Sequence, residues 1–490
     1  METRPQRGHD HVAPGPAAQA GLIVLTAALA FGVRAALLFD DPWAHGYDGW
    51  YYVLQVRALL DGAALFADRS LVFWPLVALG ALTGDVIVGN KIAACLFAAT
   101  TAGFGAVAAQ RWRRSWWAGL VCGLWWAASP LHLGVSAEFL KNSAGAVILA
   151  ALLATLPGCE RDRRRVGLAV GLALLGPMVH KLAGVMGLIA AGSYAAVHML
   201  SGRLSPRLLG GVLLVGLGLV AASGLLRPSD LLRLTDPSAP TTNRLAALTG
   251  GRLVLPEQLE LAWVMATPLV LAVSAIRDRS QRAFTLAILP LAVIATAPGL
   301  PFGWDLTAWR LMLMGFIPAG LTLALLATRS GIGAGLAGLA TVGVMLALPE
   351  SVHAHRGRSP DYRAWASARA AIRDAVPAEG RVVAHRGLCG FVWAEAGVIC
   401  ENFHPAGDGE GWWRIAYGFS VDRLQPYTTA EEPPMFLRPG YTLVHEPAWR
   451  RFVAAEGDRF RLTRDARNPW RPRPEFVYGP GQETPAPDSK

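Results

Sequence analysis

Residues 40–62 of the chain read DDPWAHGYDGWYYVLQVRALLDG and come directly after a hydrophobic segment. The first part of this stretch, residues 40–52, holds three carboxylates, one histidine and a run of aromatic side chains. A loop that only joined two helices would not need these residue types. The stretch is therefore the first candidate for chemistry, and its position after a hydrophobic segment places that chemistry at a membrane surface.

The composition indicates that much of the chain faces lipid. The chain has 490 residues, of which 53% are hydrophobic and 16% are charged, whereas soluble domains carry roughly 25% charged residues. Its net charge is +10, but the positive residues lie scattered between hydrophobic segments. This pattern favours membrane anchoring over a nucleic-acid partner. The predicted fold class is mainly α, a polytopic helical membrane protein.

The hydrophobic segments predict about eleven transmembrane helices. The apolar segment 71–84 is too short for an ordinary span, so we place it in the membrane interface or as a re-entrant segment. The predicted spans are 21–39, 86–109, 116–133, 139–156, 166–179, 182–199, 208–226, 261–276, 283–297, 306–327 and 332–348. The stretch from Trp50 to Leu60 has the pattern of an amphipathic helix on the membrane surface.

The arginines decide the orientation. With the N-terminus in the cytoplasm, five short loops carry arginine on the cytoplasmic side, as the positive-inside rule requires. These arginines are Arg111, Arg113, Arg114, Arg161, Arg163, Arg164, Arg165, Arg203, Arg207, Arg277, Arg279, Arg282 and Arg329. If segment 71–84 spanned the membrane, all of them would move outside. The long outer loop 227–260 is the exception, because it carries four arginines together with Asp230, Asp236, Glu257 and Glu260.

This orientation divides the chain into four parts. Residues 1–18 are expected to be a disordered cytoplasmic N-terminus, and residues 19–349 a transmembrane domain whose first outer loop is 40–85. Residues 350–470 are expected to form a small extracytoplasmic α/β domain, because the composition changes there to Arg, Pro, Glu and Trp. Residues 471–490 are rich in proline and are expected to be a disordered tail.

The C-terminal domain shows both helical and strand patterns. Residues 362–376 have apolar side chains at helical spacing, and Pro377 ends that helix. Residues 381–385 are expected to form a strand. Cys389 and Cys400 lie in the same polar region and could form a disulfide if the domain is outside the cytoplasm, a point that the sequence leaves open.

Lysine is rare and unusually placed. Only four of the 45 basic residues are lysines, and one of them is the C-terminal Lys490. The other three, Lys91, Lys141 and Lys181, all lie at predicted outer membrane edges. An ammonium group is a compact point charge that suits a phosphate. Lysines that extend to the interface from helix ends are the alternative explanation for any one of them, but the three together favour a phosphate site.

The order and sidedness of these residues resemble the GT-C superfamily of polytopic membrane glycosyltransferases. The superfamily includes protein O-mannosyltransferases, aminoarabinose transferases and catalytic subunits of oligosaccharyltransferases. Its first outer loop has an aspartate, aromatics and a helix that ends in Leu-Leu-acidic-Gly, which resembles residues 48–62. Its second acidic site corresponds to Glu138, and its late basic residue followed by a proline resembles Arg310 with Pro318.

The resemblance implies a glycosyltransferase that uses a polyprenyl-phosphate sugar as donor. Asp48 would be the general base and Glu138 the second catalytic residue. Lys91, Lys141, Lys181 and Arg310 would bind the donor phosphate. The secondary candidates are Asp40, Asp41, His45, His180, Tyr51 and Tyr52, and Asp40 and Asp41 remain rivals to Asp48 as the base.

Cofactor use stays open at this stage. The superfamily's double-acidic motif is reduced here to Glu138, so a divalent cation (Mg²⁺ or Mn²⁺) held by Asp48 and Glu138 is one alternative and metal-free catalysis the other. The Trp-Trp-Asp acceptor motif of oligosaccharyltransferases is absent from the sequence, which argues against peptide N-glycosylation. The resemblance leaves the sugar, the acceptor (glycan, lipid or protein) and the oligomeric state undefined.

Two other classes compete with an enzyme. A transporter or flippase of lipid-linked sugars would predict internal repeats and charges near the membrane midplane, whereas the charges here gather at one face and no repeat is visible. A non-catalytic membrane assembly subunit is the third class. In the enzyme interpretation the protein lies in the cytoplasmic (inner) membrane of a prokaryote, with its active site and C-terminal domain on the extracytoplasmic face.

Overall fold

The computed structural model describes residues 15–46, 48–66, 68–202, 254–277, 282–296, 310–329, 331–358, 362–384, 386–401 and 409–456. The chain forms two compact units, one made of residues 1–42 and 59–358 and the other of residues 43–58 and 359–490. Some predictions fall outside the described residues. These are the span 208–226, residues 306–309 of the span 306–327, the strand residue His385, the tail 471–490 and most of the N-terminal stretch 1–18.

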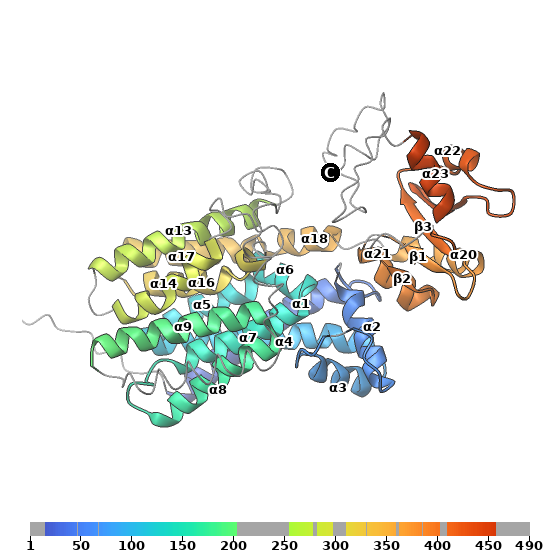
Figure 1. Cartoon of the computed structure of the whole chain (residues 1–490). Coiled ribbons are helices and arrows are strands. Elements are labelled where there is room, and N and C mark those ends of the chain that lie inside the picture. The colour runs from blue at the N-terminus through green and yellow to red at the C-terminus, as the bar shows by residue number, and fades with distance from the viewer. Residues whose placement is uncertain are drawn as a thin grey trace, which may run out of the picture. The chain divides into compact units, whose positions relative to one another are not determined.

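The first unit is a bundle of helices (Figure 1). Its helices are α1 (Pro16–Leu38), α3 (Phe73–Thr83), α4 (Val86–Arg113), α5 (Trp116–Ala128), α6 (Pro130–Glu138), α7 (Leu140–Thr155), α8 (Arg163–Val179), α9 (Lys181–Leu200), α13 (Leu255–Arg277), α14 (Arg282–Thr296), α16 (Phe316–Ala327), α17 (Ile332–Leu346) and α18 (Leu348–Arg358). Because α1 begins at Pro16, the end of the stretch predicted to be disordered is helical. A proline suits this position because the N–H groups of the first helical turn have no acceptor within the helix, so the N–H that proline lacks is not missed.

The described residues include five helices long and apolar enough to cross a membrane, or seven if each of two bent pairs counts as one span. The bent pairs are α5 with α6, at 50°, and α17 with α18, at 44°. The short apolar segment predicted at 71–84 is the 11-residue helix α3. The mainly helical, multi-pass fold is thereby confirmed, whereas the count of eleven spans and their orientation remain predictions.

Small residues let the helices approach closely. Trp126 of α5 is fully buried, and α4 and α16 both pack against α5. A Cβ at Gly105 of α4 would lie 2.2 Å from the Trp126 ring, and one at Gly320 of α16 would lie 2.4 Å from it. The indole therefore occupies the space that two glycines leave, which is the usual way in which membrane helices pack without a hydrophobic driving force between them.

The second unit contains a small mixed sheet, of which Figure 1 labels β1, β2 and β3. The strand order is β2-β1-β3-β5-β4; β1 pairs in parallel with β2 and β3, and β5 pairs antiparallel with β3 and β4. The strands are β1 (Arg381–Val383), β2 (Cys400–Glu401), β3 (Trp412–Tyr417), β4 (Met435–Arg438) and β5 (Tyr441–His445). The helices are α2 (Gly49–Leu60, mostly in this unit), α19 (Tyr362–Ala366), α20 (Ala368–Ala375), α21 (Arg386–Phe391), α22 (Val421–Leu424) and α23 (Glu446–Glu456), with a π-helical turn at Val392–Ala396 and a 3₁₀ turn at Gln425–Tyr427.

Residues 43–58 belong to this second unit because their aromatic side chains pack there. The Trp50 ring lies 5.6 Å from the Tyr362 ring and 5.6 Å from the Phe391 ring, and all three side chains are buried. Arg57 donates a hydrogen bond of 3.1 Å to the Ala394 carbonyl and lies 3.5 Å from the Glu395 carboxylate. Cys389 and Cys400 form the disulfide that the sequence left open.

Candidate functional site

Lys141 lies in the first turn of α7 and is paired with a carboxylate that sequence reasoning did not single out. Its ammonium donates a hydrogen bond to the Asp68 carboxylate and lies 5.6 Å from the centre of the Phe73 ring. The side chains of Lys141 and Asp68 are 22% and 21% exposed, so water and small ligands reach the pair.

The loop that carries Asp68 is fastened to the end of α8. The Asp68 carboxylate accepts a 3.0 Å hydrogen bond from the Ser70 backbone N–H. The Ser70 hydroxyl donates to the Val179 carbonyl at 2.5 Å, and the Leu71 N–H donates to the Met178 carbonyl at 3.0 Å. These bonds satisfy carbonyls that the end of a helix leaves without partners, and they set Asp68 close to the turn between α8 and α9.

That turn contributes His180 and Lys181. The His180 imidazole accepts a 3.4 Å hydrogen bond from the Ala183 N–H and so caps the start of α9. Gly145 lies one turn beyond Lys141 on α7, and a Cβ there would lie 2.9 Å from the Cβ of His180. The missing side chain at Gly145 thus brings α7 against the start of α9, and it places Lys141 near His180 and Lys181.

Arg310 belongs to a third part of the chain and lies near the start of α7. Its guanidinium lies over the Phe139 ring, 4.7 Å from the ring centre, a distance typical of a cation–π contact. Phe139 is the residue between α6 and α7. Glu138, the last residue of α6, is therefore next in the chain to the aromatic ring that holds Arg310, and its side chain is partly buried.

The electrostatics of His180 show that all of these charges act on its imidazole. Burial and the positive charge of Arg310 lower the pKa of His180 to about 3. The ammonium groups of Lys141 and Lys181 lower this pKa further, while the Asp68 carboxylate raises it. His180 is therefore neutral, and it lies among three cations and one anion. Three of the four predicted phosphate-binding residues come together here; we call Asp68, Lys141, His180, Lys181 and Arg310 the cationic cluster.

Lys91, the fourth predicted phosphate ligand, interacts with a different residue. Its ammonium donates a hydrogen bond to the Asp41 carbonyl and lies 3.9 Å from the Asp41 carboxylate, and the lysine is 5% exposed. Asp40 lies 3.4 Å from Arg356 of α18. Asp40 and Asp41, the two rivals for the role of base, thus hold the end of α1 to α4 and α18 through ion pairs.

The remaining loop candidates lie in the second unit. Asp48 precedes α2, is 7% exposed, and accepts a 3.4 Å hydrogen bond on its backbone carbonyl from the Tyr52 N–H. The rings of Tyr51 and Tyr52 lie 5.3 Å apart, edge to face. His45 is partly buried. Asp48 and Glu138 belong to different units, so their joint action, as catalytic pair or as metal ligands, remains a prediction.

A metal site has no further support in the part of the chain that the structure describes. No three His, Cys, Asp or Glu side chains gather there in a way that could hold a metal ion. The cation alternative for Asp48 and Glu138 therefore rests on the sequence resemblance alone.

A second polar cluster lies at the break between α5 and α6, and sequence reasoning missed it. The Glu260 carboxylate of α13 accepts hydrogen bonds from the Ser129 hydroxyl at 2.6 Å and from the Leu131 N–H at 2.8 Å. His355 Nε2 of α18 lies 3.3 Å from the Glu257 carboxylate and 3.1 Å from the Pro130 carbonyl. All of these side chains are buried.

The same cluster includes Arg34 of α1, which donates to the Ala127 carbonyl and, at 3.4 Å, to the Ser136 hydroxyl. Our sequence analysis placed Glu257 and Glu260 in the loop before a span that starts at residue 261, whereas α13 already begins at Leu255. The sequence contained a signal both for the arginine and for the two glutamates. Arg34 is a charge inside an apolar span, and such a charge usually has a partner and a role; Glu257 and Glu260 have the i, i+3 spacing of one helix face.

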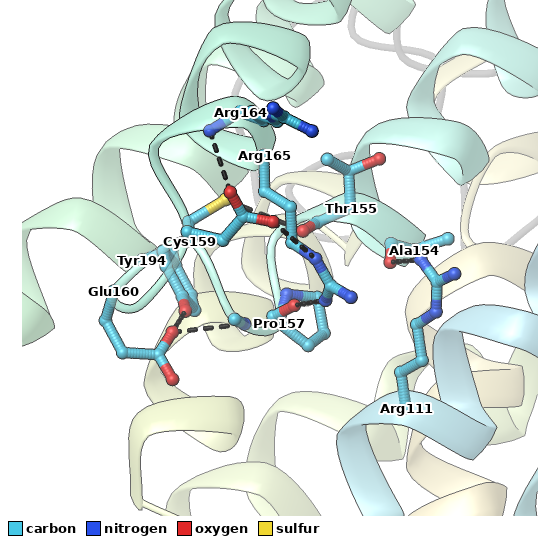
Figure 2. A network of polar contacts seen from close by, with 11 residues as sticks. Arg111, Ala154, Thr155, Pro157, Cys159, Glu160, Arg164, Arg165 and Tyr194 are labelled. Atoms are coloured by element: carbon cyan, nitrogen blue, oxygen red, sulfur yellow. Dashed lines mark hydrogen bonds and ion pairs between the residues drawn. The ribbon is translucent and has the colours of Figure 1, made fainter.

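The opposite end of α7 carries a different network, drawn in Figure 2. Arg111 of α4 donates to the Ala154 carbonyl at 2.8 Å, and Arg165 of α8 donates to the Pro157 carbonyl at 2.6 Å. Tyr194 of α9 donates to the Glu160 carboxylate. Cations at the C-terminal end of a helix are favourable because they face its free carbonyls. These arginines come from the clusters that sequence analysis assigns to the cytoplasm, so α7 runs between the two predicted faces.

No protein-family model matches the chain, and no curated protein sequence is similar to it. Solved structures do share its fold. ArnT from Cupriavidus metallidurans bound to undecaprenyl phosphate matches with a TM-score of 0.55 at 14% identity, over 87% of this chain and 98% of ArnT. The apo oligosaccharyltransferase of Archaeoglobus fulgidus matches with a TM-score of 0.50 at 11% identity, over 78% of this chain and 64% of its own length. Both have the GT-C fold, so the predicted resemblance is confirmed for the fold.

Proposed function

We propose that this protein is a membrane glycosyltransferase that transfers a sugar from a polyprenyl-phosphate-linked donor to an extracytoplasmic acceptor. The observation that carries the proposal is the cationic cluster, in which the charges of Lys141, Lys181 and Arg310 all act on the neutral His180 and Lys141 is paired with Asp68. These three side chains come from the start of α7, the start of α9 and the segment before α16. Three cations that act on one buried imidazole suit an anionic ligand, and the phosphate of a lipid-linked donor is such an anion.

The chemistry follows from the charges. Asp48, or one of its rivals Asp40 and Asp41, takes the proton of an acceptor hydroxyl as that oxygen attacks the anomeric carbon. The bond between this carbon and the phosphate oxygen breaks, and its electron pair stays with the phosphate. The leaving phosphate gains negative charge in this step. The three cations of the cluster, Lys141, Lys181 and Arg310, stabilise that charge, as preorganised charges do in other enzymes.

The likeness of fold supports a lipid-linked donor. The ArnT structure contains undecaprenyl phosphate, so a protein whose fold matches 87% of this chain binds a polyprenyl phosphate. Glu138, next to the Phe139 ring that holds Arg310, is proposed to orient the acceptor or to hold a cation with Asp48. No particular observation favours the transporter or the assembly subunit.

The test compares envelope glycolipids, glycans and glycoproteins by mass spectrometry in a strain that lacks the protein and in complemented strains. Wild type should restore one sugar modification, while Asp48→Asn and Arg310→Met, inserted at normal levels, should not. Two matched controls carry the same changes at exposed positions, Asp374→Asn in α20 and Arg164→Met at the start of α8, and should restore it fully.

The possible negative results distinguish a wrong base from a wrong function. If Asp48→Asn restores the modification and Arg310→Met does not, the base is Asp40 or Asp41 and the phosphate site stands. If the deletion changes no sugar modification, or if Arg310→Met restores it fully, the proposed function is wrong.

A further inference from the structure

We propose that Asp68 is an internal counter-ion of the donor site that competes with the phosphate for Lys141 and thereby promotes release of the product. The inference rests on the proposed function and adds a residue to it. It starts from the ion pair between Asp68 and Lys141, which forms inside the cluster that is proposed to hold the donor phosphate.

The position of Asp68 is fixed by the protein and not by Lys141 alone. The Ser70 N–H donates to its carboxylate, and the Ser70 hydroxyl and Leu71 N–H tie the loop to the carbonyls of Val179 and Met178. The carboxylate therefore stays beside the cluster when a ligand enters. Because both side chains of the pair are about one-fifth exposed, a phosphate oxygen can reach the ammonium from the solvent side.

The charge of the ligand changes during the reaction. A sugar linked through phosphate to a polyprenol is a phosphodiester with one negative charge. After transfer the phosphate is a monoester, which carries about −1.5 to −2 at neutral pH. Cations attract this product more strongly than they attract the donor, because the interaction scales with the charge of the ligand, and they would therefore tend to retain it.

Asp68 offsets that tendency. Its carboxylate is a negative charge paired with Lys141, and it acts on His180 with the opposite sign to Lys141, Lys181 and Arg310. Its carboxylate repels the monoester more strongly than the diester, since the interaction scales with the charge. Pairing of Asp68 with Lys141 after transfer then replaces the contact that the leaving product gives up.

The experiment measures binding of undecaprenyl phosphate to the purified full-length protein in detergent. Asp68→Asn should lower the dissociation constant about threefold to fivefold, the range expected for one partly exposed charge pair. In a Lys141→Met background the same change should have a much smaller effect. Glu350→Gln removes a charge from an exposed side chain of α18 and serves as the control without effect.

Asp68→Ser is the second variant, because a serine also removes the charge and can still accept from the Ser70 N–H. The melting temperature of each variant reports whether it is folded. If wild type binds and neither Asp68 variant binds more tightly, the counter-ion role is wrong and the proposed function stands. If wild type does not bind, or if Arg310→Met and Lys181→Met bind as well as wild type, the proposed donor site is wrong and the inference fails with it.

Discussion

Glu260 of α13 accepts a 2.6 Å hydrogen bond from the hydroxyl of Ser129, the residue between α5 and α6. The two side chains are buried, and the second carboxylate oxygen accepts from the Leu131 N–H. The carboxylate thus satisfies a free N–H in the first turn of α6 and lies at the positive end of its dipole. This contact fixes the helix that carries Glu138 at its other end.

Removal of the Glu260 carboxylate should destabilise the helical bundle. In Glu260→Ala the Ser129 hydroxyl and the Leu131 N–H would be buried without their acceptor, at a cost of about 2–4 kcal/mol. Glu260→Gln keeps one acceptor and should cost less. Thermal unfolding in detergent measures the difference. The exposed Glu350→Gln is the control, and an unchanged melting temperature in Glu260→Ala would contradict the capping role.

Gly145→Ala should separate α7 from α9. The new methyl group would lie 2.6 Å from the Cβ of Ala183 and 2.9 Å from that of His180, so the helices must move apart, at a cost of about 1–3 kcal/mol. Transferase activity should fall because Lys141 would move away from Lys181. Gly167→Ala in α8 is the matched control, since a Cβ there meets nothing within 4 Å; equal melting temperatures for the two variants would refute the packing argument.

The folded protein should lose stability on acidification because of His180. Burial and the neighbouring Arg310 lower the pKa of His180 from 6.5 to about 3. Below pH 6.5 the unfolded chain binds a proton that the folded chain does not bind, so stability present above that pH is lost as the pH falls towards 3, by up to about 1.4 kcal/mol per pH unit.

The variant His180→Asn should therefore show a smaller drop in melting temperature between pH 7 and pH 5 than wild type. His353→Asn changes an exposed histidine of α18 and should follow the wild-type profile. A His180→Asn profile parallel to that of wild type would show that other groups govern the acid sensitivity.

Reduction of the disulfide should destabilise the second unit. Cys389 and Cys400 are separated by 11 residues in sequence, and closing a loop of this size contributes about 2–3 kcal/mol. The double variant Cys389→Ser/Cys400→Ser should melt at a lower temperature than wild type and should no longer respond to a reductant. The other three cysteines are buried and free, so a reductant effect that persists in the double variant would be evidence against this assignment.

The local patterns of the chain predicted a large part of its fold. The strand predicted at 381–385 is present as β1, and the helix predicted over 362–376 is present as two shorter helices, α19 and α20. The short apolar segment 71–84 is the helix α3. The predicted span at 116–133 is present as the bent pair of α5 and α6, because Ser129 and Pro130 interrupt the helix and Glu260 stabilises the break.

Lys91, Lys141 and Lys181 could be singled out as candidate phosphate ligands because lysine is rare in this chain and its positions follow the predicted membrane edges, and Arg310 could be singled out from the family resemblance. Asp68 could not be found in this way. No local sequence feature distinguishes Asp68 from other aspartates in polar loops, and its partner Lys141 lies 73 residues away in the chain. The contact depends on the docking of its loop at the end of α8.

The sequence by itself determined which segments are apolar and helical and where most of the basic side chains lie along them, because hydropathy and helix periodicity are properties of each segment alone. Only the tertiary structure decided which charges meet. The pairing of Asp68 with Lys141, the capping of α6 by Glu260 and the packing of Trp50 with Phe391 all join residues remote in sequence. Such pairs depend on how helices pack at a few glycines and breaks, and no local pattern encodes that geometry.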